Sequence, residues 1–248
     1  MSQALEDKVV LITGAARRVG AAIVRSLHGA GARIAIHHRG SGAEADALSA
    51  ELNATRPGSA ILLQADLLDT AKLPGLVEAT LAAFGRLDIL VNNASTFYPT
   101  PVGTITEGQW DDLLGTNLKA PLFLSQAAAP ALRASEGLIL NIVDIHGLRP
   151  LKGFPVYSPA KAGLVMLTHA LARELAPQVR VNAIAPGPVL FPETGLTEDK
   201  KADIIDRTLL KRRGSPQDIA RAALFFAADA PYVTGQVLAI DGGRSTNA

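Results

Sequence analysis

The sequence predicts a doubly wound α/β domain, with a parallel sheet of about seven strands and helices on both faces in three layers. Short apolar runs alternate with segments of 3.6-residue periodicity along the whole chain. The apolar runs lack strict alternation, as expected for parallel strands that helices cover on both faces. No linker, charge block or repeat interrupts this pattern, so we expect residues 1–248 to form one domain.

Each element is placed by its own pattern, taken in chain order. The apolar runs predict strands at 8–12, 33–37, 60–64, 87–91, 138–143, 179–184 and 236–240. The periodic segments predict helices at 19–28, 43–55, 71–84, 106–133, 155–175 and 216–228. The stretch 186–213 has three prolines, several charges and only weak helical periodicity. Because it follows a strand, we expect a substrate lid around residues 187–213.

Composition excludes several classes of function. The 24 Lys and Arg residues nearly balance 23 Asp and Glu residues, which gives no basic surface for nucleic acid. The absence of cysteine excludes disulfides, thiolate metal sites and a cysteine nucleophile. The N-terminal charge order does not fit a secretory signal, and the longest uncharged stretch is too polar to span a membrane. A cytoplasmic protein with no membrane or nucleic-acid partner is expected.

The first strand-to-helix turn has features of a dinucleotide site. It reads Thr-Gly-Ala-Ala-Arg-Arg-Val-Gly, from Thr13 to Gly20. Gly14 permits a tight turn and Gly20 permits close packing of the helix, while the helix N-terminus offers unpaired N–H groups to a pyrophosphate. The Gly-x5-Gly spacing departs from the common G-x-G-x-x-G pattern, so a purely structural turn stays an alternative.

The end of the second strand favours NADPH over NADH. The sequence there is His37-His38-Arg39-Gly40-Ser41, with no carboxylate before Glu44. Arg39, Ser41 and the next helix N-terminus could bind a 2′-phosphate, whereas an acid would select a 2′-hydroxyl. A solvated turn with an incidental arginine is the alternative. Neighbouring strand residues point to opposite faces, so the two histidines predict no metal site.

Tyr157 and Lys161 are four residues apart and therefore lie side by side on the predicted helix. A nearby ammonium group stabilises a phenolate and lowers the tyrosine pKa, which would make Tyr157 a proton donor in a reduction. A simple contact on the helix surface is the alternative for this pair.

The order and spacing of these motifs resemble the short-chain dehydrogenase/reductase family over residues 8–243. The matching features are Gly14-x5-Gly20, the run 92–95, Asn117, Tyr157-x3-Lys161 and Pro186-Gly187. The resemblance implies a Rossmann-like fold, with Tyr157 as general acid, Lys161 on the nicotinamide ribose and Asn117 supporting a water relay. The cofactor-binding residues it implies are Gly14, Arg17, Arg18, Val19, Gly20, His38, Arg39, Gly40, Ser41, Asp66, Leu67, Asn93, Ala94, Ser95, Tyr157, Lys161, Pro186, Gly187 and Val189.

Asp144 departs from the family pattern, which usually has serine about thirteen residues before the tyrosine. Asp144 is a Brønsted acid, which suits reduction of a C=N bond because the nitrogen must gain a proton. Alternatively, Asp144 only caps or solvates the strand end. We count Asp144, Tyr157, Lys161 and Asn117 as the predicted catalytic residues.

Further motifs resemble pteridine reductases, the subgroup that reduces pterins with NADPH. They are the run 92–101 around Phe97, Arg18 directly before Val19-Gly20, the run 43–50, and Asp144 itself. The resemblance implies a pterin stacked between the nicotinamide and Phe97; the alternative for Phe97 is an anchor that holds its loop in the core. The implied substrate-binding residues are Arg18, Ser95, Phe97, Asp144 and Tyr157.

Two departures leave the substrate open among dihydrobiopterin, dihydromonapterin and dihydrofolate. The chain lacks the long insertion of parasite pteridine reductases, and its lid sequence at 188–192 differs from theirs. A carbonyl reductase of the same family and a catalytically silent NADP(H)-binding sensor are the rival readings. The resemblance also implies a homotetramer formed through the helices at 106–133 and 155–175 and the C-terminal region.

Overall fold

The computed structural model describes residues 4–191 and 196–246, which form a seven-stranded, all-parallel sheet. The strand order is β3-β2-β1-β4-β5-β6-β7. All seven predicted strands are confirmed, with ends shifted by no more than about two residues. They are β1 (Val9–Ile12), β2 (Arg33–His38), β3 (Ala60–Gln64), β4 (Ile89–Asn92), β5 (Leu138–Ile142), β6 (Arg180–Pro186) and β7 (Val237–Ile240).

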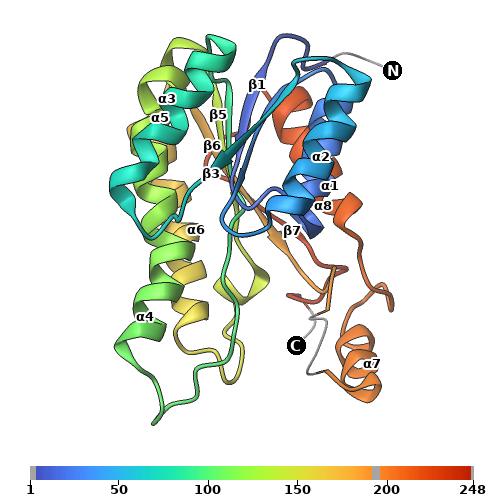
Figure 1. Ribbon diagram of the computed structural model, residues 1–248. Helices are drawn as coiled ribbons and strands as arrows, with labels where there is room; N and C mark the ends of the chain where they lie inside the picture. The colour runs from blue at the N-terminus through green and yellow to red at the C-terminus, as the bar shows by residue number, and fades with distance from the viewer. Residues whose placement is uncertain (1–3, 192–195, 247–248) are drawn as a thin grey trace.

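Helices cover both faces of the sheet, as Figure 1 shows. One face carries α1 (Arg18–Gly29), α2 (Gly42–Thr55) and α8 (Pro216–Leu224). The other carries α3 (Leu73–Phe84), α5 (Ala120–Ala134) and α6 (Tyr157–Glu174). The predicted Rossmann-like, three-layer fold is therefore confirmed.

The apolar strand runs divide between two core layers. In β1, Val10 and Ile12 pack with α1 and α8, whereas Val9 and Leu11 pack with α3 and α5. All four side chains are fully buried. Burial on both faces explains why the strand sequences are continuously apolar rather than alternating.

The helix predicted at 106–133 is confirmed in extent, but it contains a π turn that the sequence did not indicate. The structure has α4 (Glu107–Leu114), a π-helical turn at Gly115–Lys119, and then α5. Thr106 begins α4 through a capping box with Gln109. Turns of the π type are frequent at functional sites. A second π turn, Phe225–Asp229, follows α8 where the sequence predicts continuous helix.

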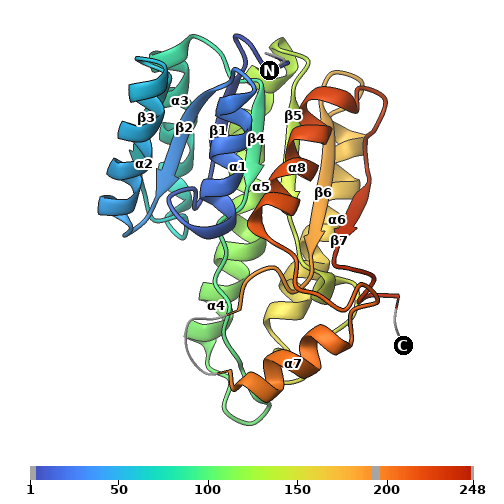
Figure 2. The ribbon, with the colours of Figure 1, turned by 90° about the vertical axis from the view of Figure 1, so that its right-hand side faces the viewer.

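The predicted lid contains a helix, α7 (Glu198–Asp206), which its weak periodicity did not indicate. Thr197 begins this helix by accepting a hydrogen bond from the Lys200 N–H. Figure 2 shows α7 and part of α4 beyond the carboxyl ends of the strands, where ligands bind in doubly wound sheets. Pro192, which the lid prediction includes, lies outside the described residues. None of the helices in the described ranges is long and apolar enough to cross a membrane.

Candidate active site

The turn after β1 is held from β4. Gly14 has a φ of +59°, and a Cβ there would lie 2.8 Å from the Ala94 Cα. Asn93 donates from Nδ2 to the carbonyls of Thr13 and Gly14, both at 2.9 Å. A Cβ on Gly20 would lie 2.5 Å from the Gly14 carbonyl oxygen. Both glycines are therefore required, for backbone conformation and for close packing.

Thr13 is a residue that the sequence analysis missed. Its Oγ1 accepts hydrogen bonds from the N–H groups of Asn93 and Ala94, each at 3.0 Å. Thr13 thus fixes the backbone predicted to lie near the cofactor ribose. A threonine directly before the first glycine was the available signal.

The N-terminus of α1 has the features of an anion site. Arg17 precedes the helix in an extended conformation, and no side chain caps the first turn. The N–H groups of that turn therefore lack helical partners. Arg17 forms an exposed ion pair with Glu44 at 3.4 Å. Val19 follows inside the helix, packed against the core.

Arg18 adopts a left-handed conformation with a φ of +54°, which is uncommon for a residue with a side chain. Such conformations cluster at functional sites. Its guanidinium donates to the Phe191 carbonyl at 3.4 Å, so it joins the phosphate turn to the lid. The predicted contacts of Arg18 with pterin and phosphate stay predictions.

The end of β2 fits a phosphate ligand. His38 is buried, and its Nδ1 atom is one of two buried side-chain polar atoms without a partner among the described residues. Such an orphaned atom calls for an explanation, and a bound ligand supplies one. Arg39 and Gly40 are exposed beside it, and Ser41 precedes α2 without capping it through its side chain.

The loop after β3 borders the same edge of the sheet. Asp66 is exposed and accepts the Leu68 N–H at 3.0 Å, whereas Leu67 is buried. β3 pairs with β2 in parallel, so both loops lie at the same edge of the sheet. The placement agrees with the predicted adenine contact but does not test it.

Asp144, Tyr157 and Lys161 come together between β5 and α6. The Tyr157 hydroxyl donates to Asp144 Oδ2 at 2.8 Å. The other oxygen, Oδ1, accepts the His146 N–H at 2.8 Å. Asp144 therefore both caps the turn after its strand and contacts the predicted general acid. Lys161 donates from Nζ to the Ile142 carbonyl at 3.0 Å and lies 5.8 Å from the centre of the Tyr157 ring.

Burial governs the protonation of this cluster. Burial raises the pKa of Tyr157, and the charge and hydrogen bond of Asp144 raise it further. Burial lowers the pKa of Lys161 to about 8, against an opposing effect of Asp144. Lost hydration and the neighbouring carboxylate thus hold the pKa of Tyr157 above its usual value, so the hydroxyl keeps its proton. The lowering of the Tyr157 pKa by Lys161 stays a prediction.

Asn117 lies in the π turn and is held by protein groups. Its Oδ1 accepts the Ser95 hydroxyl at 2.7 Å. Its Nδ2 donates to the carbonyls of Leu113 and Thr96, at 2.9 and 3.0 Å. The π turn thus presents Asn117 to the loop after β4, next to Ser95. The water relay between Asn117 and Lys161 stays a prediction.

Phe97 forms an aromatic cluster with the residues before α6. Its ring stacks on Phe154 at 4.6 Å and meets the edge of Tyr157 at 4.8 Å. The Phe97 side chain is still 45% exposed. One face is covered by Phe154, so ring surface remains beside Tyr157 for a flat ligand. Phe154 was missed, although it precedes Tyr157 by three residues.

Gly147 is a third residue that the sequence analysis missed. A Cβ at this position would lie 2.8 Å from the Lys161 carbonyl carbon, inside α6. Only glycine allows the turn after Asp144 to approach the helix so closely. This contact brings Asp144 within hydrogen-bonding distance of Tyr157.

The turn after β6 packs against the end of β7. A Cβ on Gly187 would lie 2.5 Å from the Asp241 Cβ, and its N–H donates to the Ile240 carbonyl at 3.0 Å. The Val189 N–H, predicted near the nicotinamide carboxamide, donates to the Gly187 carbonyl at 2.8 Å. Pro186 is the last residue of β6.

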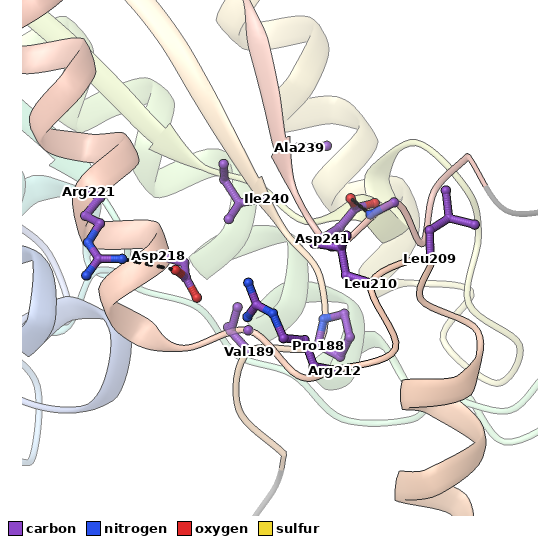
Figure 3. Close-up of a pocket in the computed structure, with 13 residues that line it drawn as sticks. Pro188, Val189, Leu209, Leu210, Arg212, Asp218, Arg221, Ala239, Ile240 and Asp241 are labelled. Carbon is purple, nitrogen blue, oxygen red and sulfur yellow. Dashed lines mark hydrogen bonds and ion pairs between the residues drawn. The ribbon is translucent and has the colours of Figure 1, made fainter.

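A cavity of about 500 Å³ adjoins this turn, and Figure 3 shows its lining. It shares Pro188 and Val189 with the predicted nicotinamide site, but Asp144, Tyr157 and Phe97 do not line it. Asp218 in its wall is held by Ser215 and Arg221, as Figure 3 shows for the arginine. The cavity lies on the α8 side, apart from the proton-donating cluster.

Comparison with known proteins identifies the family of this chain. A family model described as enoyl-(acyl carrier protein) reductase matches residues 14–245. The chain belongs to the short-chain dehydrogenase/reductase family. As a short-chain dehydrogenase/reductase, it is an oxidoreductase. The family roles expected for Tyr157 and Lys161 stay predictions.

Two relatives that are equally similar to this chain are named for different substrates. The chain is 35% identical to pteridine reductase 1 of Leishmania tarentolae over 280 residues, covering 96% of each protein. It is also 35% identical to a 3-oxoacyl-(acyl-carrier-protein) reductase of Staphylococcus aureus over 240 residues, covering 95% and 97%. The first alignment is longer than this chain, so that relative carries insertions that this chain lacks.

A solved structure confirms the fold. A blue fluorescent protein from a metagenomic library, in complex with NADPH, superposes with a TM-score of 0.91 at 34% identity. The match covers 97% of this chain and 98% of the other. The sheet, its strand order and its covering helices are thus those of a nucleotide-binding short-chain dehydrogenase/reductase.

Proposed function

We propose that the protein is an NADPH-dependent pteridine reductase, which converts a dihydropterin to its tetrahydro form. The hydrogen bond between Asp144 and Tyr157 carries this proposal. A carboxyl group there can exchange a proton with a ring nitrogen, whereas the usual serine only donates a hydrogen bond to a carbonyl. The pteridine reductase of Leishmania tarentolae, similar over 96% of this chain, supports it.

NADPH is the cofactor that the site fits. The uncapped α1 terminus would hold the pyrophosphate, and the buried His38 Nδ1 with Arg39 would hold the 2′-phosphate. The structural relative that contains NADPH supports this assignment. Lys161 would contact the nicotinamide ribose.

When bound, the nicotinamide supplies a hydride to the carbon of the pterin C=N bond. The ring nitrogen gains a proton, for which Tyr157 is the donor and Asp144 the adjoining acid. Phe97 would orient the pterin through its exposed ring surface, because offset stacking suits flat heterocycles. The buried Lys161, whose pKa is lowered to about 8, would be the charged group nearest the Tyr157 ring.

Steady-state NADPH oxidation with dihydrobiopterin, dihydromonapterin, dihydrofolate and a 3-oxoacyl thioester tests the substrate. We expect turnover with at least one pterin and a preference for NADPH over NADH. Asp144→Ser should lower pterin kcat at least about 100-fold, as for loss of a general acid, while NADPH still binds. Unchanged pterin turnover in this variant would contradict the proposal.

A carbonyl reductase is the second candidate. The Staphylococcus aureus relative is as similar as the pteridine reductase, and the matching family model is described as an acyl-carrier-protein reductase. Turnover of the thioester but of no pterin would establish this candidate. NADPH binding without turnover of any of these substrates would favour the silent sensor.

We also propose that the protein assembles as a homotetramer. Exposed apolar side chains gather on α4, α5 and α6, among them Trp110, Phe123 and Met166. Leu238 in the edge strand β7 is also exposed, as are Phe225 and Tyr232 in the segment between α8 and β7. Such faces mark protein interfaces when they are contiguous.

A further inference from the structure

His37 lies near the end of β2 with its side chain buried between two loops. Only 1% of the residue is exposed. Nδ1 accepts the Gly14 N–H at 3.3 Å, and Nε2 bonds the Ala65 carbonyl at 3.1 Å. Both ring nitrogens are therefore used, one by the turn after β1 and one by the loop after β3.

The two partners fix the protonation of the ring. A carbonyl only accepts, so Nε2 must carry the hydrogen; a backbone N–H only donates, so Nδ1 must be bare. Burial lowers the pKa of His37 to about 4; the hydrogen bond to Ala65 and the charge of Asp66 oppose this shift, and His38 adds to it. The ring thus stays neutral at physiological pH and keeps both hydrogen bonds.

These bonds complete the support of the phosphate turn. Two side chains hold the backbone of Gly14. Its N–H donates to His37 Nδ1, and its carbonyl accepts from Asn93 Nδ2. The Ala15 N–H donates to the His37 carbonyl at 2.9 Å. Ala65 directly precedes Asp66 and Leu67, the predicted adenine contacts. One rigid ring therefore sets the spacing between the pyrophosphate turn and the adenine loop.

We propose that His37 is a positioning residue for the adenosine half of NADPH, acting through Gly14 and Ala65. The inference rests on the NADPH cofactor of the proposed function, and not on the pterin. Precise placement of binding groups by a packed, hydrogen-bonded support improves affinity because less ordering is needed on binding. The proposal places the effect of His37 in cofactor affinity and not in the proton-donating cluster.

His37→Phe and His37→Gln test this role by titration of NADPH fluorescence. Phenylalanine keeps the ring volume without hydrogen bonds, whereas glutamine offers an acceptor and a donor. We expect a Kd for NADPH about tenfold higher in His37→Phe, from two lost hydrogen bonds, and within about threefold of wild type in His37→Gln. In assays at saturating NADPH, kcat should not change while KM for NADPH follows the Kd.

His28→Phe is the matched control. His28 is also buried, and its Nε2 bonds the Ser59 hydroxyl at 2.7 Å, away from the phosphate turn. It should lower thermal stability without changing the Kd for NADPH. If His37→Phe does not fold, His37→Asn replaces it, because its shorter amide cannot span both partners and should also weaken binding.

Three outcomes are distinguishable. An unchanged Kd in a folded His37→Phe or His37→Asn protein would overturn the inference. Equal weakening in His28→Phe would also overturn it, because the effect would then follow stability. Failure of the wild-type protein to bind NADPH would instead overturn the cofactor assignment in the proposed function.

Discussion

At the scale of single residues, burial decides which groups carry charge. Tyr157 keeps its proton because burial and the Asp144 carboxylate both raise its pKa. Lys161 is buried in the same place, and its pKa falls to about 8. Lost hydration therefore makes the charged form of Lys161, the expected partner of Tyr157, less stable.

The buried, neutral His37 also predicts an acid dependence of stability. Its pKa is lowered to about 4 from an unfolded value near 6.5, so the unfolded chain binds the proton first as pH falls. Stability is present above pH 6.5 and is lost toward pH 4. Between pH 7 and 5 the loss from His37 is about 2 kcal/mol.

Urea unfolding at pH 7 and pH 5 measures this effect. Between pH 7 and pH 5, the free energy of unfolding should fall by about 2 kcal/mol less in His37→Phe than in wild type, because phenylalanine does not titrate. Parallel losses in the two proteins would show that His37 does not contribute.

At the scale of elements, close contact between the turn after β5 and α6 builds the cluster. In Gly147→Ala, the new Cβ would meet the backbone of Lys161 and Ala162, which the helix holds in place. The turn must therefore move, which lengthens the 2.8 Å bond between Asp144 and Tyr157. We expect a loss of about 1–3 kcal/mol in stability and a fall in kcat of about tenfold or more.

Gly75→Ala in α3 is the control for this substitution. A Cβ there would meet nothing within 4 Å, so alanine should be neutral or slightly stabilising. Calorimetry and steady-state kinetics compare the two variants. Full activity in Gly147→Ala would mean that the close approach is not needed.

At the scale of the whole molecule, the uncovered apolar faces predict assembly. Met166 on α6 is 64% exposed, and Phe123 on α5 is also exposed. The helices α5 and α6 lie on the same face of the sheet (Figure 1). A Met166→Glu and Phe123→Glu double variant should sediment as a smaller species, because it places charge in an apolar interface. Ala47→Glu, on the exposed side of α2, should sediment like wild type. A wild-type monomer would exclude the tetramer.

The sequence by itself determined the order of strands and helices along the chain. It also predicted that Asp144, Tyr157 and Lys161 belong to one site, and the structure brings these residues together. Both results depend on local patterns and on motif spacing, which are present in one dimension. The π turn inside the helix predicted at 106–133 was not predicted.

Only the tertiary structure decided the remaining features. His37, Gly147 and Phe154 act through contacts with residues outside their own segments, which no local pattern records. The tertiary structure also decided that the pKa of Tyr157 is raised. A tyrosine four residues from a lysine suggests a lowered tyrosine pKa, whereas burial and the Asp144 carboxylate, in the turn after β5, raise the pKa of Tyr157. Burial and contacts between residues distant in the sequence are properties of the folded molecule, so they could not be predicted from the spacing of residues.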